Sequence, residues 1–379
     1  MTKTVLLTLG RLPKALDLAR AFASAGWRVV VAEPFAWHLS RVSRAVDKSL
    51  QVTAPAIDRH CYLEDLRRIV ADERVQLVVP VSEESMHVAA LRNLLPLDVD
   101  IFAPSQKVLL ELHDKLRFIE IAVSYSLPVP RTFPAMSADA AALAESGPHV
   151  IKPVFSCSGK GVKILKAGAP LNPDDRNALT IVQRFIPGQV YSSFSIAHKG
   201  RSVITSIYKA TVVSGTVAVA FERVDHANAV RYWIERFISS ADYSGFISFD
   251  LIESADGTVS AIECNPRVTS GIHFLDERDV VAAMLAPLTA PPVRFKTKTK
   301  FQQFYPCLTE TQKSVFQREH AMRNLKHLLS SRDVIWRASD PLPFLLMPMT
   351  SYQILAMSIF EGLSFGEAAT RDIEWTAPA

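Results

Sequence analysis

Hydrophobic and polar positions in the first hundred residues follow the pattern of a chain that forms strands and helices in turn. Short apolar runs that predict buried strands lie at residues 4–9, 28–32 and 75–81. Stretches in which apolar residues recur at helical spacing lie between them, at residues 12–25 and 62–72. The order strand, helix, strand, helix, strand predicts a parallel sheet covered by helices.

This part of the chain is therefore expected to be a Rossmann-like α/β unit. A dinucleotide-binding version of that unit carries three glycines after its first strand. Here that position reads Gly10-Arg11-Leu12-Pro13, without the second and third glycines. A nicotinamide-dependent dehydrogenase is therefore disfavoured.

The pattern changes after Ser105, which is expected to cap a helix over about residues 106–124. Pro128 and Pro130 then indicate a domain boundary. From residue 150 to residue 267 strand-like runs dominate, with one helix expected at about 227–241. This mixture is typical of an α+β domain. After residue 292 the chain differs again, with helical stretches expected at about 310–330 and 346–361.

Composition narrows the class of protein. The chain has 379 residues, of which 49% are hydrophobic and 21% charged, and this excludes a disordered chain. The 42 basic and 38 acidic residues nearly balance, so we expect no nucleic-acid partner. The four cysteines form no CxxC pair, which disfavours a zinc knuckle or a disulfide framework. Arg11 interrupts the N-terminal apolar run, and prolines interrupt the longest one, at 342–360. We therefore expect a cytoplasmic protein without a membrane span.

A predicted hairpin near residue 260 carries a candidate metal site. Residues 255–258 (Ala-Asp-Gly-Thr) form a turn, so the strands that contain Asp250 and Glu263 should pair antiparallel. Glu263 and Asn265 are two residues apart and share a face, onto which the hairpin can bring Asp250. Two carboxylates and an amide oxygen are suitable ligands for Mg²⁺. A salt-bridge cluster with Arg267 is the alternative.

Three other segments contain candidate phosphate or nucleotide contacts. Lys152 lies in an apolar strand, where an ammonium group is costly unless it meets an anion; an edge strand, suggested by the following proline, is the alternative. The loop at 156–162 contains small residues that let backbone N–H groups approach phosphate, although it is not a Walker A loop and an ordinary turn has the same composition. Residues 182–188 end in Pro-Gly and are expected either to offer backbone groups to an adenine or to form a domain hinge.

These motifs, in this order, resemble those of the ATP-grasp superfamily, which includes D-alanine–D-alanine ligase, biotin carboxylase and the large subunit of carbamoyl phosphate synthetase. The resemblance covers about residues 1–290. It implies an α/β Rossmann-like pre-ATP-grasp domain followed by α+β ATP-grasp domains and a C-terminal extension. The implied segments are the pre-domain, an N-terminal ATP-grasp subdomain with the glycine-rich loop, a C-terminal subdomain with the metal site, and the extension, at residues 1–104, 105–185, 186–291 and 292–379.

The resemblance also implies roles for individual residues. Lys115 and Lys152 correspond to lysines that hold the phosphates of ATP, and Arg267 and Lys152 to catalytic cations. The residues expected to contact the nucleotide are Ser158, Gly159 and Gly161 of the loop and Gln183, Arg184, Phe185 and Ile186 of the adenine strand. The expected ligands of Mg²⁺ or Mn²⁺ are Asp250, Glu263 and Asn265. Gln183 and Val190 stand where many members have glutamates that contact adenine and ribose.

Several residues have weaker claims to a role. Lys209 could reach the γ-phosphate or be a plain strand lysine. Glu83 and Glu84 follow a predicted strand at its carboxyl end, where an acid could receive a substrate amine, or where a helix dipole would favour it. A third group could bind substrate at a helix start, although a lone histidine is usually structural: Ser270, Gly271 and His273.

The function implied by the resemblance is that of an ATP-dependent carboxylate–amine ligase that works through an acyl-phosphate and releases ADP and phosphate. Its partners would be a small-molecule carboxylate and an amine, and the resemblance is compatible with a homodimer. A non-catalytic ATP-binding protein is an alternative motivated by Gln183 and Val190. A kinase or a carboxylase with the same nucleotide site is another, with carboxylation less favoured because no biotin-carrier region is visible.

Overall fold

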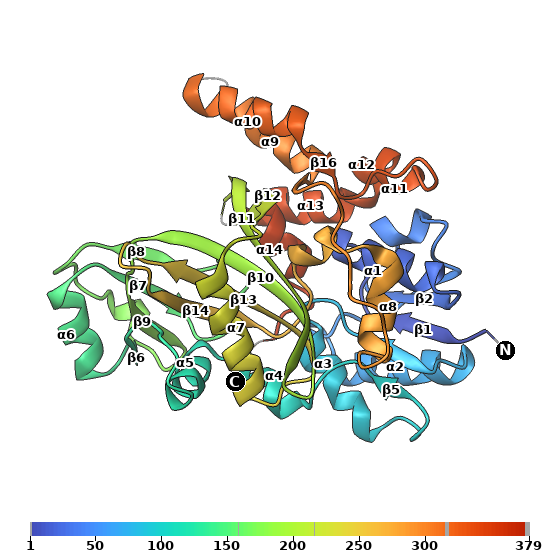
Figure 1. The fold of residues 1–379 in the computed structure, drawn as a ribbon, viewed down its shortest axis with the longest axis horizontal. Helices are drawn as coiled ribbons and strands as arrows, with labels where there is room; N and C mark the ends of the chain where they lie inside the picture. Colours follow the sequence, from blue (N-terminus) through green and yellow to red (C-terminus); the bar gives the residue numbers. More distant parts are fainter. Residues whose placement is uncertain (1, 158, 216, 315–317, 376–379) are drawn as a thin grey trace.

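The computed structural model describes residues 2–157, 159–215, 217–314 and 318–375. The described strands form sheets of five, four and seven strands. Figure 1 shows the five-stranded sheet in the blue N-terminal third at one end of the molecule and the four-stranded sheet with α6 at the other. The seven-stranded sheet lies between them.

The five-stranded sheet is parallel throughout, with the order β3-β2-β1-β4-β5. Its strands are β1 (Thr4–Leu7), β2 (Arg28–Glu33), β3 (Lys48–Gln51), β4 (Leu77–Val79) and β5 (Asp100–Ile101). Its helices are α1 (Pro13–Ser24), η1 (Leu39–Val42), α2 (Arg59–Asp72), α3 (Ser85–Val88) and η2 (Ala89–Asn93). The predicted β1, β2 and β4 are confirmed. The strand order reverses between β1 and β4, and ligands of open α/β sheets bind at such a point.

The four-stranded sheet has the order β6-β9-β7-β8 and packs against α6 (Ala138–Ser146). Its strands are β6 (Thr132–Pro134), β7 (His149–Pro153), β8 (Lys163–Leu165) and β9 (Thr180–Arg184), and η3 (Pro173–Asp175) precedes β9. The edge-strand alternative for Lys152 is wrong, because β7 lies between β9 and β8. Pro153 is tolerated there because the pairing of β7 with β8 ends at Ile151.

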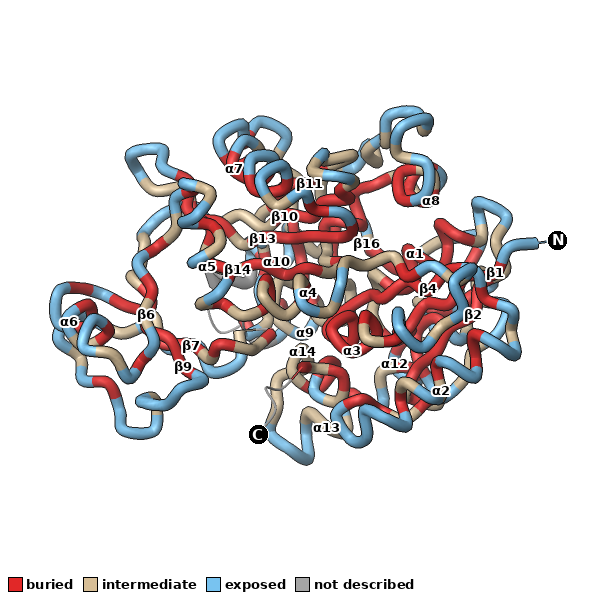
Figure 2. The backbone as a smooth tube through the Cα atoms, turned by 90° about the horizontal axis from the view of Figure 1, so that it is seen from below, coloured by how far each residue is buried: buried red, intermediate tan, exposed pale blue. Residues whose placement is uncertain are grey.

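The seven-stranded sheet has the order β14-β13-β10-β11-β12-β15-β16. Its strands are β10 (Gln189–His198), β11 (Arg201–Ser214), β12 (Val217–Arg223), β13 (Gly245–Glu253), β14 (Val259–Asn265), β15 (Lys300–Gln302) and β16 (Arg332–Asp333). Two helices pack against one face of β13 and β14, α5 (Lys115–Ser124) and α7 (Asn228–Ser240). Figure 2 shows buried stretches along β10, β13 and the parallel sheet, whereas the loops around α6 are mostly exposed.

The helix predicted over residues 106–124 is two helices, α4 (Gln106–His113) and α5. Asp114 separates them, and its carboxylate accepts hydrogen bonds from the backbone N–H groups of Leu116 and Arg117, both at 2.9 Å. An aspartate at this position caps a new helix rather than continuing the old one. Lys115 is therefore the first residue of a helix.

The chain after residue 265 forms short helices. These are η4 (Ser270–Phe274), α8 (Glu277–Leu285), α9 (Phe304–Lys313), α10 (Arg318–Ser330), α11 (Leu342–Leu345), α12 (Met347–Thr350), α13 (Tyr352–Glu361) and α14 (Phe365–Thr370). Figure 2 shows α13 and α14 between the parallel sheet and the region of β7 and β9. No helix within the described ranges is long and apolar enough to cross a membrane.

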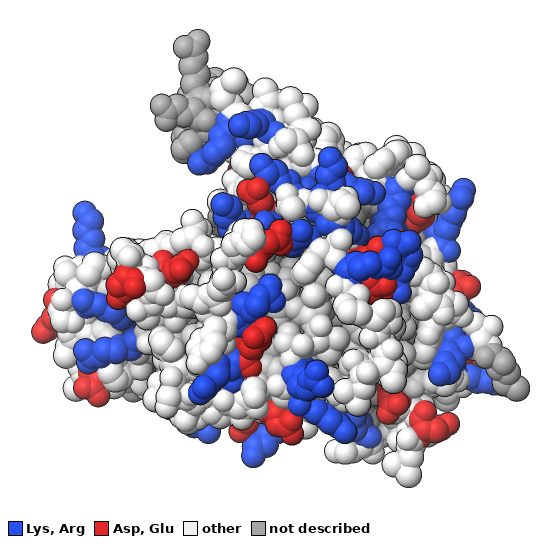
Figure 3. Space-filling model, viewed as in Figure 1, with Lys and Arg blue, Asp and Glu red and all other residues white. Residues whose placement is uncertain are grey.

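Basic side chains on the face drawn in Figure 3 lie among acidic ones and are densest around β12, β15 and β16. Several of them are paired there: Arg223 lies 2.6 Å from Asp225 and Lys300 lies 3.5 Å from Glu222.

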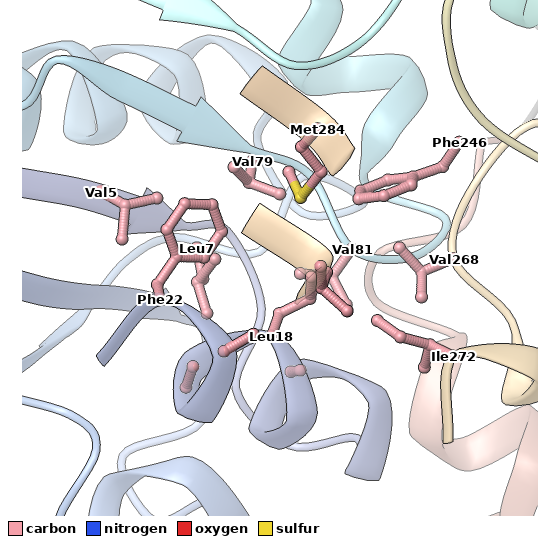
Figure 4. Close-up of a cluster of buried hydrophobic side chains, with 14 of the residues drawn as sticks. Val5, Leu7, Leu18, Phe22, Val79, Val81, Phe246, Val268, Ile272 and Met284 are labelled. Atoms are coloured by element: carbon pink, nitrogen blue, oxygen red, sulfur yellow. The ribbon is translucent and has the colours of Figure 1, made fainter. Parts of the chain in front are cut away.

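A shared core joins the parallel sheet to the seven-stranded sheet. It contains Val5, Leu7 and Val79 of the first sheet together with Phe194 and Phe246 of the second. Figure 4 shows Met284 of α8 between Val79 and Phe246, with Val268 near Phe246 and Ile272. Because this contact is buried and apolar, it holds the ends of β1 and β4 close to the β13–β14 hairpin.

Phe249 of β13 provides a test of the apolar core that β13 and β14 form with α5 and α7. Its side chain is fully buried, with its ring centroid 5.0 Å from that of Phe237 and 5.2 Å from that of Trp233. We expect Phe249→Ala to lower the free energy of unfolding by about 3–5 kcal/mol in urea titrations, because it leaves a cavity. Phe360→Ala is the control, since Phe360 is 87% exposed. A loss of less than about 1 kcal/mol for Phe249→Ala would contradict this packing.

Candidate active site

The β13–β14 hairpin brings the three predicted metal-binding side chains together. Asp250 pairs with Glu263, and Ser248 pairs with Asn265, in the antiparallel register. The Asn265 amide nitrogen lies 3.3 Å from Asp250 Oδ2 and 3.4 Å from Glu263 Oε1. Cys264 points to the opposite face and is buried. The turn and the two-residue spacing thus produce the arrangement that they predict.

The charges at this cluster are those of a cation site. Burial, and then the neighbouring Glu263 carboxylate, raises the pKa of Asp250. Burial alone would raise the pKa of Glu263 as well, but the ammonium groups of Lys115 and Lys152 lower it. Two adjacent carboxylates favour a divalent cation that would relieve their repulsion.

The donor set fits Mg²⁺ or Mn²⁺ with one adjustment. Asn265 Oδ1 accepts a hydrogen bond from Arg267 Nη2 at 3.0 Å, so the amide must rotate to offer its oxygen to a cation. Among the described residues, no group of three or more His, Cys, Asp and Glu side chains forms a complete metal cage. A cation held by Asp250 and Glu263 would therefore take further oxygen ligands from a bound phosphate or from water.

Two buried lysines converge on Glu263. Lys115 Nζ lies 3.8 Å from Glu263 Oε2 and donates to the Ser156 carbonyl at 2.8 Å and to its hydroxyl at 3.1 Å. Lys152 Nζ donates to the Ile262 carbonyl at 2.8 Å. Burial lowers the pKa of Lys152 to about 8, although Glu263 acts in the opposite direction. Buried ammonium groups beside carboxylates are suited to hold a polyanion.

The glycine-rich loop lies next to these lysines, since Lys115 binds Ser156 at its start. Gly159 and Gly161 have φ angles of 69° and 73°, which side-chain-bearing residues rarely adopt. A Cβ on Gly161 would also lie 3.0 Å from Pro153 Cγ. Ser158, predicted to contact the nucleotide, lies outside the described residues.

Arg267 connects the parallel sheet to the β13–β14 hairpin, here called the metal hairpin after the ligands predicted on it. Its Nη2 atom lies 2.5 Å from Glu83 Oε1, and His113 Nε2 lies 3.6 Å from Glu83 Oε2. The Glu83 side chain is fully buried and the Arg267 side chain is 11% exposed. Burial opposes ionisation of Glu83, but Arg267 and His113 lower its pKa. Of the two predicted acids, Glu83 is therefore the one that faces Arg267.

Glu84 has a structural role instead. Its carboxylate accepts hydrogen bonds from the backbone N–H groups of Val81 at 2.7 Å and Ser82 at 3.0 Å, and from the Thr8 hydroxyl at 3.0 Å. These bonds fix the loop after β4 against the end of β1. Because the carboxylate is fully buried and occupied, the prediction that Glu84 receives a substrate amine is wrong.

Lys14 lies beside this cluster and is not among the residues that the sequence predicts there. Its Nζ donates to Ser82 Oγ at 3.0 Å and to the Val268 carbonyl at 2.8 Å, beside Glu83 and Arg267. Burial, and then Arg267, lowers its pKa to about 7. A lysine in the first turn of a helix opposes the helix dipole, and this one follows the carboxyl end of β1. These two features together indicate, from the sequence alone, that Lys14 could lie at a ligand site.

The predicted adenine strand offers fewer free groups than expected. The Gln183 side chain is buried and donates to Thr132 Oγ1 at 3.0 Å. The backbone N–H groups of Arg184 and Phe185 already donate to the carbonyls of Arg131 and Pro148, at 2.8 Å and 3.1 Å. These two N–H groups are therefore occupied by neighbouring segments, and the contact of residues 183–186 with adenine stays a prediction. Ile186, half-buried, follows them.

Lys209 does not lie on the face of the metal hairpin. Ser192 pairs with Tyr208 on one side and with Asp250 on the other, so these three side chains share a face of the sheet. Lys209 is the next residue after Tyr208 and lies on the opposite face. The prediction that it reaches the γ-phosphate is therefore not supported by its position.

The segment after the metal hairpin packs internally. His273 is buried, and its Nδ1 lies 2.7 Å from Asp17 Oδ2 in an ion pair. A Cβ on Gly271 would lie 2.4 Å from Phe194 Cβ, so this glycine allows a close contact. The substrate role predicted for His273 and Gly271 is therefore wrong, and only Ser270 of that group remains partly exposed.

Comparisons with known proteins bear on the fold of this chain. Residues 112–271 match the family model described as an ATP-grasp domain. No curated protein sequence matches the chain significantly. Among solved structures, the N5-carboxyaminoimidazole synthetase of Staphylococcus aureus is 12% identical, with a TM-score of 0.62 over 84% of this chain and 87% of that one.

Two further solved structures share the fold. The L-amino acid ligase of Bacillus licheniformis is 15% identical, with a TM-score of 0.60 and 79% of each chain covered. The biotin carboxylase domain of Hydrogenobacter thermophilus 2-oxoglutarate carboxylase is 14% identical, with a TM-score of 0.61 over 78% of this chain and 73% of that one. The latter structure contains MgADP, ADP and bicarbonate.

Proposed function

Because residues 112–271 of this chain form an ATP-grasp domain, we propose that the protein is an ATP-dependent carboxylate–amine ligase that works through an acyl-phosphate. The observation that carries the proposal is the convergence of Lys115, Lys152 and Asp250 on Glu263, with Arg267 alongside. Cations and a carboxylate pair for a divalent metal meet the requirements of phosphoryl transfer, which is catalysed mainly by positioning and charge neutralisation.

In the first step, a carboxylate oxygen of the substrate attacks the γ-phosphorus of ATP, the bond from that phosphorus to the bridging oxygen breaks, and ADP leaves. Lys115 and Lys152 hold the phosphates in position. Asp250 and Glu263, with Asn265 after rotation of its amide, would hold Mg²⁺ or Mn²⁺, which would neutralise charge on phosphate oxygens. The glycine-rich loop excludes water, which would hydrolyse the acyl-phosphate.

In the second step, an amine nitrogen attacks the acyl carbon, and the bond from that carbon to the phosphate oxygen breaks. The leaving phosphate is a base that can take the proton the nitrogen loses. Arg267 stabilises the negative charge that builds up on the acyl oxygen and on the phosphate. The products are an amide, ADP and phosphate.

The carboxylate substrate is proposed to bind where the parallel sheet reverses its strand order, beside Arg267 and Lys14. Arg267 pairs with Glu83, and burial lowers the pKa of Lys14 to about 7, so a substrate carboxylate bound beside them would favour the protonated form of Lys14. The same proposal assigns a Rossmann-like domain to residues 1–104, ATP-grasp subdomains to 105–185 and 186–291, and an extension to 292–379. The Bacillus ligase, by its name, is an enzyme that acts on L-amino acids, which supports a ligase.

Trapping the intermediate tests the proposal. The full chain is incubated with Mg-ATP, an amino-acid pool and hydroxylamine, the phosphorus products are followed by ³¹P NMR, and hydroxamates are identified by mass spectrometry. The proposal predicts ADP, phosphate and a hydroxamate whose mass identifies the carboxylate. AMP with pyrophosphate would overturn the ligase mechanism as written.

A carboxylase is the second candidate, because two of the fold relatives carry carboxylation in their names. A carboxylase would release ADP and phosphate only when bicarbonate is present, and hydroxylamine would not trap an organic acid. A kinase would give ADP with a stable phosphorylated product. A non-catalytic binding protein would bind ATP tightly and leave it intact.

A further inference from the structure

The C-terminal segment of residues 364–375, here called the C-terminal clamp, contacts the glycine-rich loop. Glu374 Oε1 lies 2.6 Å from Lys160 Nζ, and Thr370 Oγ1 lies 3.2 Å from Cys157 Sγ. Cys157 is buried by this contact region, with 5% of its surface exposed. Two residues of the loop therefore have partners more than 200 positions away in the chain.

The clamp is anchored on the parallel-sheet region. The Arg11 guanidinium binds both oxygens of Asp372, at 2.6 Å and 3.0 Å, and its side chain is fully buried. The backbone N–H of Ala56 donates to the Asp372 carbonyl at 3.1 Å. The Trp375 ring lies 4.9 Å from the His87 ring. A buried, two-point arginine–carboxylate pair is among the more rigid polar contacts available to a protein.

The clamp also has a well-defined start. Ser364 and Glu367 form a capping box at the N-terminus of α14: the Ser364 hydroxyl accepts from the Glu367 N–H, and the Glu367 carboxylate accepts from the Ser364 N–H. Such a box fixes the first turn of a helix. Thr370 lies at the end of this short helix, and its hydroxyl is directed toward Cys157.

The loop is therefore held from two sides. On one side Lys115 binds the carbonyl and hydroxyl of Ser156, and on the other side Thr370 and Glu374 bind Cys157 and Lys160. The glycines of the loop have the conformational freedom to let it move away, so external contacts decide its position. The contact from the phosphate side alone would leave Lys160 unrestrained.

We propose that the C-terminal clamp holds the glycine-rich loop closed over the phosphate site, and that Glu374 is the positioning residue, acting through Lys160. The proposal rests on the proposed function only in that the loop covers nucleotide phosphates. The clamp thus makes the parallel-sheet region and the C-terminal end of the chain parts of one nucleotide site, although neither lies within the matched residues 112–271.

The test uses the full chain and compares Glu374→Gln with Glu73→Gln. Glu73 is a matched control because it also pairs with a half-exposed lysine, Lys48 of β3, and neither residue belongs to the clamp or to the glycine-rich loop. Hydrogen exchange of a peptide that spans residues 153–163 is measured without nucleotide, and the Kd for Mg-ATP is measured by calorimetry. We expect Glu374→Gln to speed exchange of this peptide and to raise the Kd about 5-fold, since Lys160 is partly exposed and such pairs are modest. Glu73→Gln should change neither.

A charge swap separates positioning from simple destabilisation. The double variant Lys160→Glu with Glu374→Lys should restore the slow exchange, because the pair is re-formed with its signs reversed. Unchanged exchange in Glu374→Gln would overturn the clamp, and so would a lower Kd, which would mean that Glu374 keeps Lys160 away from the nucleotide. Failure of the wild-type protein to bind Mg-ATP would instead overturn the proposed function, while the exchange measurement would still decide whether Glu374 holds the loop.

Discussion

Replacing Glu263 by alanine is expected to lower turnover by about 10³-fold with the carboxylate identified by trapping. Glu263 lies near the ammonium groups of both buried lysines and pairs with Asp250 across the hairpin. Its loss would remove a proposed metal ligand and leave the two ammonium groups without this carboxylate. The measurement is the rate of ADP release at saturating Mg-ATP. Full turnover in Glu263→Ala would contradict the assignment of the metal site.

The matched control for this variant is Asp256→Asn. Asp256 lies in the turn of the same hairpin and is exposed, and its carboxylate accepts hydrogen bonds only from its neighbours Ser254 and Thr258 among the contacts of the described residues. Turnover should stay within about 2-fold of the wild-type value, since surface changes away from a site have small effects. A large loss in Asp256→Asn as well would indicate that the hairpin, rather than the metal site, had been damaged.

Replacing Arg267 by alanine is expected to have two separable effects. Loss of the guanidinium should lower kcat by about 10²- to 10³-fold, because it removes charge stabilisation from the transition state. It should also lower the free energy of unfolding by about 3–5 kcal/mol, because the buried Glu83 carboxylate loses its ion pair with Arg267 and keeps only the longer contact with His113 and the more distant charge of Lys14. Steady-state kinetics and urea titrations measure the two effects.

A second substitution distinguishes them. Glu83→Gln in the Arg267→Ala background removes the buried charge, so most of the lost stability should return. Turnover should remain low, because the guanidinium is still absent. If the double variant recovered its turnover together with its stability, Arg267 would be a structural residue, and the acyl-phosphate role proposed for it would be wrong.

The sequence predicts the metal hairpin well because the relevant interactions are local. A Gly-containing turn, antiparallel pairing and the alternation of side chains fix the positions of Glu263 and Asn265 relative to Asp250. The helix over 106–124 is predicted less well. Its apolar periodicity continues past Asp114 as in a single helix, whereas the Asp114 carboxylate caps a second helix. The ATP-grasp resemblance, which depends on the order of several such motifs, is confirmed over residues 112–271.

Long-range contacts account for what the sequence leaves undetermined. Lys14 joins the site only because the shared core brings α1 against the metal hairpin, and Glu374 reaches Lys160 from the far end of the chain. His273 pairs with Asp17, 256 residues earlier in the chain, and so does not belong to the site. No local pattern encodes partners at such separations. Strand β3 is not predicted for a different reason: none of its four residues is fully buried and only one is apolar, so it contains no apolar run.

In the proposed reaction, a carboxylate oxygen becomes bonded to the γ-phosphorus of ATP. The direct measurement uses the carboxylate identified by trapping, labelled with ¹⁸O in its carboxyl group, together with Mg-ATP and the amine. Mass analysis of the released phosphate shows whether an oxygen has been transferred. With an acyl-phosphate intermediate, each turnover is expected to place one carboxyl ¹⁸O in inorganic phosphate. Amide formation with no ¹⁸O in the phosphate would contradict it.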